Sequence, residues 1–557
     1  MSKQPPSPEW WLQVVIGWHG LAAATAFITS LLLLTGLGPA ADLALWVRIL
    51  GGIVLLVGSG ASGAAAYYIT QRNHRGRTLS LFFNYLAFVT FFLGVCQATG
   101  VFLGIDNLAD TIGRGLPFLL IVFVGYLVGT VADRFEGNYA RQQQINRVSQ
   151  GIMVVAGLAA ALAVGLLPGT LYLLKQLANP IALALVAGAI ITGLMLWLMW
   201  REKAATALHA QTHHEAMLNG YLFLSPNLLG FLIFFAGPLL LSLYVSFTDW
   251  DAFGTRNWVG LDNYAEILNL TVDTLDSPDQ RADEVLDITT YSELTRLTVG
   301  GRTFIIGAED RLFWLSLRNT FVFAILAVPL SVGIALLLSN LLNTKLPGIK
   351  FFRAVYFLPS IAAVVGISLV WQWLYNSTIG FINYGILSLV TFVNNIFGWE
   401  LADPAIRWLS ESRTALLAII IMAVWQTVGF NTVLFLAGLQ NIPGDLYEAA
   451  TVDGAGKWAQ FRNVTIPMLA PTTFFVVTTT LIKSLQVFEE IFILTNPVGG
   501  PDNSTLTLVV YLYQNGFQYF KQGYASAIAW VLFIVIFGAT LWQFRRQRQT
   551  VSGVYDV

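Results

Sequence analysis

Charged residues are scarce in this chain of 557 residues, of which only 11% are Asp, Glu, Lys or Arg. A soluble globular protein has about 25% charged residues, so an ordinary soluble domain is excluded. Hydrophobic residues make up 56% of the chain. The composition therefore predicts an all-α polytopic membrane protein surrounded by a lipid bilayer. The formal net charge of −1 offers no basic surface for nucleic acid, and no such partner is expected.

Cysteine and nucleotide-binding signatures are also lacking. Cys96 is the single cysteine, so no intrachain disulfide can form. Gly58–Gly63 fits the dinucleotide pattern G-x-G-x-x-G, but it lies in an apolar run without a preceding strand and reads as a helix-packing face. Gly454–Lys457 looks like part of a phosphate loop, but Thr451 replaces the first glycine and Trp458 replaces the magnesium-binding hydroxyl. We therefore expect no cofactor or metal on this chain and no ATP site of its own.

About twelve apolar runs are long enough to span a membrane. The first is too long for the apolar part of a signal peptide. Six runs precede residue 201 and six follow it: Trp11–Leu37, Leu45–Thr70, Leu79–Gly104, Leu116–Ala132, Gly151–Leu174, Ile181–Trp200, Tyr221–Phe247, Asn319–Leu342, Phe351–Leu374, Thr414–Leu439, Thr472–Leu494 and Tyr524–Phe544.

Basic residues mark alternate connections between these runs. Loops rich in Lys and Arg face the cytoplasm, which predicts that both termini and the loop near 441–471 are cytoplasmic and that Asp249–Leu317 lies outside. The basic residues concerned are Arg72, Arg75, Arg77, Arg134, Arg141, Arg147, Arg201, Lys203, Lys345, Lys350, Arg353, Lys457, Arg462, Arg545, Arg546 and Arg548.

Two polar segments divide the chain. Arg201–Met217 contains His209, His213 and His214, but no convincing third and fourth metal ligand, so it is interpreted as a solvated cytoplasmic linker. Residues 1–217 then form an N-terminal extension of about six helices, and residues 218–557 form a core of six. An insert at about 270–312 is expected outside the membrane, with a β-hairpin over Leu294–Ile306. The roles of the extension and the insert are open.

The most informative stretch is the polar segment Asn441–Pro471. Pro443 and Gly444 end the preceding span, and Asp445 is expected to cap a short helix, with Glu448 completing a capping box. Asp453-Gly454 predicts a tight turn, and Lys457–Val464 predicts a second short helix that ends before Pro467. These features predict a helix–turn–helix elbow that projects from the membrane.

This stretch resembles the EAA loop of ATP-binding-cassette (ABC) importer permeases. The resemblance rests on three segments and their spacing, Glu448-Ala449-Ala450, Asp453-Gly454-Ala455 and Ile466–Pro471. The flanking sequence over Tyr221–Arg546 resembles the maltose-type, carbohydrate-importing branch. The resemblance implies a prokaryotic inner-membrane protein working with a second permease, two ATPase subunits that bind ATP and Mg, and an extracytoplasmic solute-binding protein. It implies ATPase coupling by Leu446, Tyr447, Glu448, Ala449, Ala450, Asp453, Gly454, Ala455 and Pro467.

Lys483 lies near the middle of a predicted span, where an unpaired charge facing lipid costs at least about 2.5 kcal/mol. Gln426, Asn431, Glu489 and Glu490 are further polar residues in spans, and they mark either interhelical hydrogen bonds or a polar path. The resemblance implies that the solute path is lined by Trp425, Val428, Gly429, Thr480, Ser484 and Val487. Lys483 would favour a phosphorylated or acidic solute.

These observations favour the membrane subunit of an ATP-driven, binding-protein-dependent importer for a sugar or oligosaccharide. Glycerol phosphate or another polar solute is the alternative cargo. A secondary transporter that uses Lys483 and Glu489/Glu490 as a charge relay is a different class, for which inverted repeats would be expected. A membrane-anchored sensor or scaffold is a third, suggested by the additional N-terminal helices.

Overall fold

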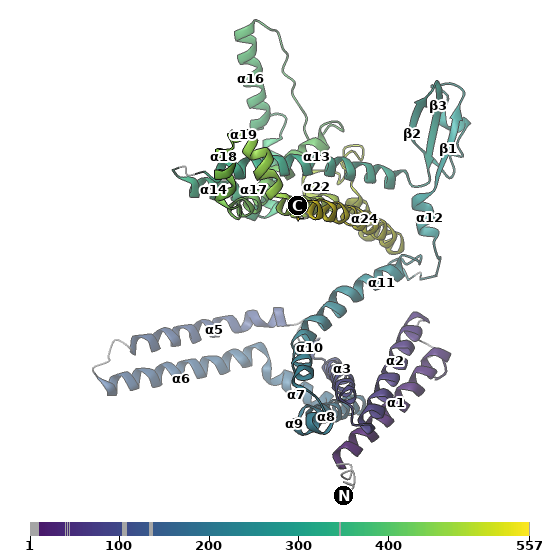
Figure 1. Cartoon of the computed structure of the whole chain (residues 1–557), viewed down its shortest axis with the longest axis vertical. Helices are drawn as coiled ribbons and strands as arrows, with labels where there is room; N and C mark the ends of the chain where they lie inside the picture. The colour runs from purple at the N-terminus through teal and green to yellow at the C-terminus, as the bar shows by residue number, and fades with distance from the viewer. Residues whose placement is uncertain are drawn as a thin grey trace. The chain divides into compact units, whose positions relative to one another are not determined.

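The computed structural model of the protein divides into two compact units, Met1–Leu229 and Gly230–Val557, whose elements are labelled in Figure 1. The structure describes residues 10–38, 41, 43, 45–102, 108–132, 138–254, 256–344 and 347–555. Of the predicted cytoplasmic residues, Arg134 and Lys345 lie outside these ranges. The boundary predicted at residue 217 falls inside helix α10 (Thr212–Phe231).

The first unit is a set of long apolar helices. α1 packs on α2, α2 on α3, and α3 on α8, while α5 pairs with α6. Leu12, Leu81 and Met199 belong to the buried core of the first group. The bounds of the helices are α1 Trp10–Thr35, α2 Leu45–Thr70, α3 His74–Ala98, α5 Leu108–Val131, α6 Tyr139–Val164, α7 Leu166–Gln176, α8 Pro180–Trp200 and α9 Glu202–Ala207.

The fifth predicted span, Gly151–Leu174, is wrong as a single helix. α6 begins earlier, at Tyr139, and ends at Val164. Gly165 has φ +92°, a left-handed conformation that terminates a helix and that glycine adopts without a Cβ penalty. Residues 166–176 therefore form the separate helix α7, a break hidden by the continuous apolar composition on either side.

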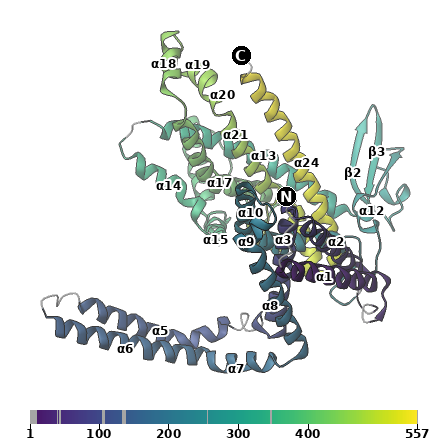
Figure 2. The same cartoon turned by 60° about the horizontal axis from the view of Figure 1, so that its bottom comes forward.

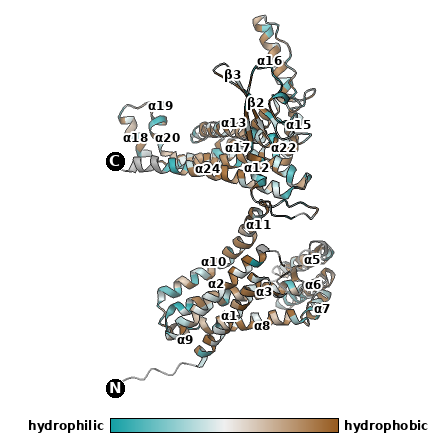
Figure 3. Cartoon of the chain, turned by 90° about the vertical axis from the view of Figure 1, so that its right-hand side faces the viewer, coloured by the Kyte–Doolittle hydropathy of each residue, from teal (hydrophilic) through white to brown (hydrophobic). Residues whose placement is uncertain are grey.

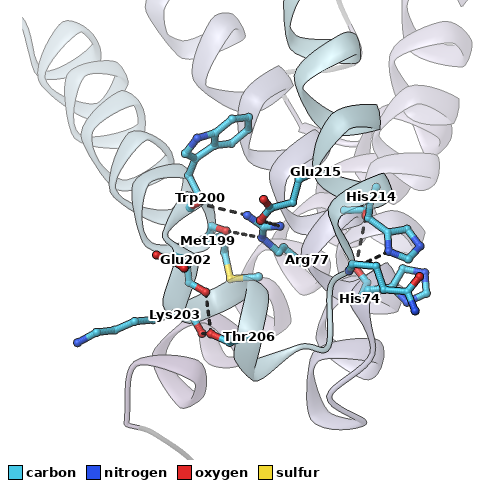
Figure 4. A network of polar contacts seen from close by, with 11 residues as sticks. His74, Arg77, Met199, Trp200, Glu202, Lys203, Thr206, His214 and Glu215 are labelled. Atoms are coloured by element: carbon cyan, nitrogen blue, oxygen red, sulfur yellow. Dashed lines mark hydrogen bonds and ion pairs between the residues drawn. The ribbon is translucent and has the colours of Figure 1, made fainter.

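The segment Arg201–Met217, which the sequence predicts to be a solvated linker, is helical over most of its length. α9 buries Ala204 and Ala205. In Figure 4 the Arg77 side chain points between the end of α8 and the start of α10. Its Nε donates to the Met199 carbonyl at 2.9 Å, and its Nη1 lies 3.4 Å from Glu215 Oε1. A buried guanidinium with these partners holds the segment against α3 and α8.

The second unit is organised around α17 (Ala415–Gln440), which packs against α13 (Arg311–Leu342), α14 (Ile349–Ile361), α21 (Ala470–Leu485) and α22 (Glu489–Leu494). Figure 3 shows hydrophobic residues along α13, α17 and α22. The remaining helices are α11 Gly237–Val245, α12 Asp262–Leu268, α15 Val364–Leu374, α16 Phe381–Phe397, α18 Gly444–Val452, α19 Lys457–Gln460, α20 Ile466–Met468, α23 Leu508–Tyr513 and α24 Gln522–Tyr555, with π turns at Leu232–Ala236, Phe461–Thr465 and Gln514–Gln518 and a 3-10 turn at Ala282–Glu284.

The described residues contain ten helices long and apolar enough to cross a membrane, or up to twelve if two bent pairs each count as one span. The expected number of spans is therefore confirmed, but two more predicted spans, in addition to Gly151–Leu174, are not single helices. Residues 351–374 form α14 and α15, which are bent by 99°. Residues 472–494 break between α21 and α22. The short apolar helix α16 was not predicted.

The insert between α12 and α13 is a small antiparallel sheet in the order β1-β3-β2. Its strands are β1 Leu270–Leu275, β2 Ser292–Val299 and β3 Arg302–Ala308. Gly300 and Gly301 join β2 and β3 with φ +60° and +82°, which is the backbone of a type I′ hairpin turn. The predicted hairpin is confirmed, and β1 is an additional strand that pairs with β3.

Candidate functional site

The elbow between α17 and α21 is a helix–turn–helix closed by its own hydrogen bonds. Gly454 has φ +78°, and its amide donates to the Thr451 carbonyl at 3.0 Å. Gln460 Nε2 donates across the turn to Thr451 Oγ1 at 2.8 Å. The hydroxyls of Tyr447 and Thr465 share a hydrogen bond of 2.9 Å. These bonds join the two arms, so the elbow can move as one body.

Two predicted details of the elbow are wrong. α18 begins at Gly444 after Pro443, and it has no side-chain cap, so Asp445 and Glu448 do not form a capping box. Proline at the N-cap position fixes the chain without supplying a capping oxygen. The second arm also continues past Val464, through a π turn, to α20. Pro467 therefore lies inside the second arm, directly after the π turn Phe461–Thr465, and not beyond its end.

Apolar side chains of the elbow are exposed. Val452 is 88% exposed and Trp458 is 73% exposed, and Leu446 and Met468 are also exposed. Figure 2 shows α18, α19 and α20 extending from the helices of the second unit at the end where α24 terminates. Exposed apolar residues grouped on a projecting element are typical of a protein–protein contact.

The predicted path residues of α21 lie together. Thr480 and Ser484 are buried, and Asn431 Nδ2 on α17 donates to Thr480 Oγ1 at 3.1 Å. Interhelical hydrogen bonding therefore accounts for this pair. A cavity of about 20 Å³ is lined by polar and apolar residues that include Thr427, Thr480, Lys483, Ser484, Val487 and Glu490. That volume holds about one water molecule, so this cavity is too small for a sugar.

The predicted path residues of α17 do not line this cavity. Trp425 is half-exposed, and its ring meets that of Trp371 edge-on at 5.6 Å. Val428 is buried. At Gly429 a Cβ atom would overlap the carbonyl oxygen of Tyr356 on α14. Gly429 therefore lets the two helices approach closely.

A polar clamp that was not predicted holds the loop between α22 and α23. Asn319 Nδ2 donates to the Leu506 carbonyl at 3.0 Å and to the Asn503 carbonyl at 3.1 Å. Thr320 Oγ1 accepts from the Leu508 amide at 2.9 Å. No local signal in the sequence identified these partners, which lie almost two hundred residues apart along the chain.

A second unpredicted cluster surrounds the Asp310 carboxylate at the start of α13. Asp310 accepts hydrogen bonds from the Phe313 amide at 2.9 Å and from the Tyr511 hydroxyl at 2.8 Å. The Tyr524 hydroxyl also donates to it. This buried carboxylate thus ties the N-terminus of α13 to α23 and α24.

Three comparisons relate the chain to known proteins. Residues 319–549 match the family model described as "Binding-protein-dependent transport system inner membrane component". The probable ABC transporter permease protein YesP of Bacillus subtilis is 32% identical over 329 residues, covering 59% of this chain and 90% of the relative. The lactose transport system permease protein LacF of Rhizobium radiobacter is 36% identical over 243 residues, covering 43% of this chain and 78% of the relative.

Among solved structures, a bacterial ABC transporter involved in the import of the acidic polysaccharide alginate has a similar chain. The TM-score is 0.44 and the identity is 21%, covering 59% of this chain and 94% of the other.

Proposed function

This chain belongs to the family of binding-protein-dependent inner-membrane components, the permease subunits of ABC transporters, and we propose that it forms half of the translocation path of an importer for a sugar or oligosaccharide. Its relative LacF is named for lactose transport, which supports a carbohydrate cargo. The protein is a multi-pass inner-membrane permease, and its own residues supply binding and movement rather than ATP chemistry.

The observation that carries this proposal is the elbow. The two arms of the elbow are joined to each other by hydrogen bonds, and its outer side chains are exposed. The elbow contains the proposed coupling residues Leu446, Tyr447, Glu448, Ala449, Ala450, Asp453, Gly454, Ala455 and Pro467. Leu446 and Val452 on α18 would dock into an ATPase subunit, and the bond between Tyr447 and Thr465 would carry its displacement to the second arm. The same displacement then reaches α21, which follows α20 directly.

The complete transporter in this proposal contains a second permease with its own elbow, two ATPase subunits that bind ATP and Mg, and an extracytoplasmic solute-binding protein. Both termini and the elbow face the cytoplasm, and the insert at 270–308 faces outward. Closure of the ATPases on ATP biases the permeases between inward-facing and outward-facing states. Such coupling requires that the ATPases contact the elbow differently in the two states.

The cargo passes between the two permeases along a path to which this chain contributes α17 and α21. Within this chain the cavity lined by Lys483 and Glu490 has a volume of about 20 Å³, so we place the sugar outside it, between the two permeases. The shared position of Lys483 and Glu490 also keeps a charge relay, and hence an ion-driven transporter, as the competing function.

Purification of the affinity-tagged chain from its natural cells in mild detergent tests the proposal. We expect an ATPase and a second permease to be retained, identified by mass spectrometry. A well-folded chain that purifies without any ATPase would contradict the proposal.

Transport by the reconstituted complex distinguishes the two functions. In proteoliposomes with solute-binding protein, uptake of a radiolabelled oligosaccharide should require ATP and persist after ion gradients are collapsed. Uptake that follows an ion gradient and ignores ATP would assign the charge relay instead.

A further inference from the structure

The helix α16 divides sharply into two faces. Its sequence FINYGILSLVTFVNNIF contains no charged residue. At about 3.6 residues per turn, one side of the helix carries Gly385 and most of the hydrophobic residues. These are Phe381, Ile382, Ile386, Leu389, Val390, Phe392, Val393, Ile396 and Phe397. The opposite side carries Asn383, Tyr384, Leu387, Ser388, Thr391, Asn394 and Asn395.

The polar face is occupied by the chain's own following loop. Asn383 Nδ2 donates to the Ile406 carbonyl at 2.9 Å, and Trp408 Nε1 donates to Asn383 Oδ1 at 2.8 Å. Asn394 Nδ2 donates to the Leu401 carbonyl at 2.9 Å, and the Leu401 amide donates to Asn394 Oδ1 at 3.0 Å. The loop thus lies against part of the polar face and satisfies the amides of Asn383 and Asn394.

The apolar face is left open in the second unit. Phe381 is 76% exposed, and Leu389, Phe392, Ile396 and Phe397 are each more than half exposed. The exposed apolar surface continues onto the end of α15, where Trp373 is also exposed. α15 is half of a bent pair of helices that is apolar enough to be a candidate membrane span, so α16 follows an element that we expect to meet lipid.

α16 cannot itself be a span. Its 17 residues extend about 25 Å at 1.5 Å per residue, which is less than the hydrocarbon thickness of about 30 Å. The return segment 398–414 has no regular helix and contains Glu400, Asp403 and Arg407. Irregular backbone of this kind does not cross the lipid core.

The position and direction of α16 agree with a helix lying on the membrane surface. It joins the end of α15 to the start of α17, whereas the elbow follows the other end of α17. The end of α15 is held against the start of α17, because the Tyr375 hydroxyl donates to the Ala418 carbonyl at 2.8 Å. Figures 1 and 3 both show α16 running crosswise to α13 and α24.

We propose that α16 is an interfacial helix that lies flat in the outer leaflet, with its apolar face in the acyl boundary and its loop in water. The choice of leaflet rests on the proposed orientation of the elbow. Because α16 has no charge, its attachment depends on buried apolar area and not on anionic lipid, unlike the usual basic interfacial helix. Trp399, whose ring lies beside that of Phe397 at the end of α16, suits the interface, where tryptophan is enriched.

Spin labels on single cysteines in the full-length chain, with Cys96 replaced by Ser, test this placement in nanodiscs. The matched pairs are Leu389→Cys and Ile396→Cys on the apolar face, and Thr391→Cys and Asn395→Cys on the polar face. We expect the first pair to be several-fold more accessible to oxygen than to a water-soluble nickel complex, and the second pair to show the reverse. The contrast should be the same in neutral and in anionic lipid.

Three outcomes would overturn the proposal. High nickel accessibility at all four positions would indicate that the apolar face awaits a soluble partner. Low accessibility of Leu389→Cys and Ile396→Cys to both reagents would indicate that protein covers it. A contrast that appears only in anionic lipid would contradict attachment by apolar area. None of these outcomes depends on ATPase binding, so failure here is separable from failure of the proposed transport function.

Discussion

The close approach of α14 and α17 at Gly429 gives the sharpest prediction for this fold. A Cβ atom added at Gly429 would overlap the carbonyl oxygen of Tyr356 and would lie 3.1 Å from its carbonyl carbon and 3.3 Å from the Phe357 Cα. All three are backbone atoms, so no side chain can rotate away. Since a carbon and a carbonyl oxygen approach to about 3.3 Å at closest, α14 must retreat by on the order of 1 Å.

Gly429→Ala should therefore lower stability although alanine is the better helix former. Overpacking of this kind costs about 1–3 kcal/mol, which outweighs the gain of about 1 kcal/mol from helix propensity. The matched control is Gly333→Ala in α13, where a Cβ meets nothing within 4 Å. The assay is thermal denaturation in detergent, followed by the loss of monodisperse protein in size-exclusion chromatography.

We expect a lower midpoint for Gly429→Ala and an unchanged or raised midpoint for Gly333→Ala. Equal midpoints in the two variants would refute the close packing of α14 on α17. Gly429→Ser should follow Gly429→Ala, because both add the same Cβ atom.

Three further predictions address the elbow, the topology and the path. Gly454→Val should abolish ATP-dependent uptake, because a β-branched residue at φ +78° is strained by about 1–2 kcal/mol. The control Gly456→Ala should retain uptake, because Gly456 has φ −68°. Equal uptake by the two variants would contradict the role of the turn. With Cys96 replaced by Ser, Ser277→Cys should react with an impermeant thiol reagent in intact cells and Val452→Cys should not, and the reverse pattern would overturn the orientation. Lys483→Met should change uptake of an acidic oligosaccharide more than that of a neutral one, while equal, unchanged uptake of both would remove Lys483 from the path.

Much of the elbow was predictable because its signals are local. The turn at Gly454 depends on one residue that tolerates positive φ, and the two helical arms follow from short runs of residues. The capping box failed because Pro443 is the N-cap and α18 starts at Gly444, two residues earlier than an Asp445 cap requires. The bonds of Gln460 and Thr465 across the elbow could not be read from the sequence, since they depend on how the two arms fold back.

The path was harder to predict, because membership of a cavity depends on which way each helix face turns. Thr480, Lys483 and Ser484 share the cavity because they lie on one side of α21, and Val487, just beyond the end of that helix, also lines it. On α17 the cavity meets Thr427 instead of Val428 or Gly429. Small residues such as Gly429 serve close helix packing as readily as a path, and composition does not distinguish the two.

The sequence by itself determined the class of protein, the number of spans and the elbow, because transfer into lipid depends on composition summed over about 20 residues and a turn depends on a few neighbours. The tertiary structure alone decided which helices touch and what clamps the loops. The contact at Gly429 and the hold of Asn319 on Leu506 both depend on groups that are distant along the chain. Their geometry is set by packing between helices, which a linear pattern of hydrophobic residues does not encode.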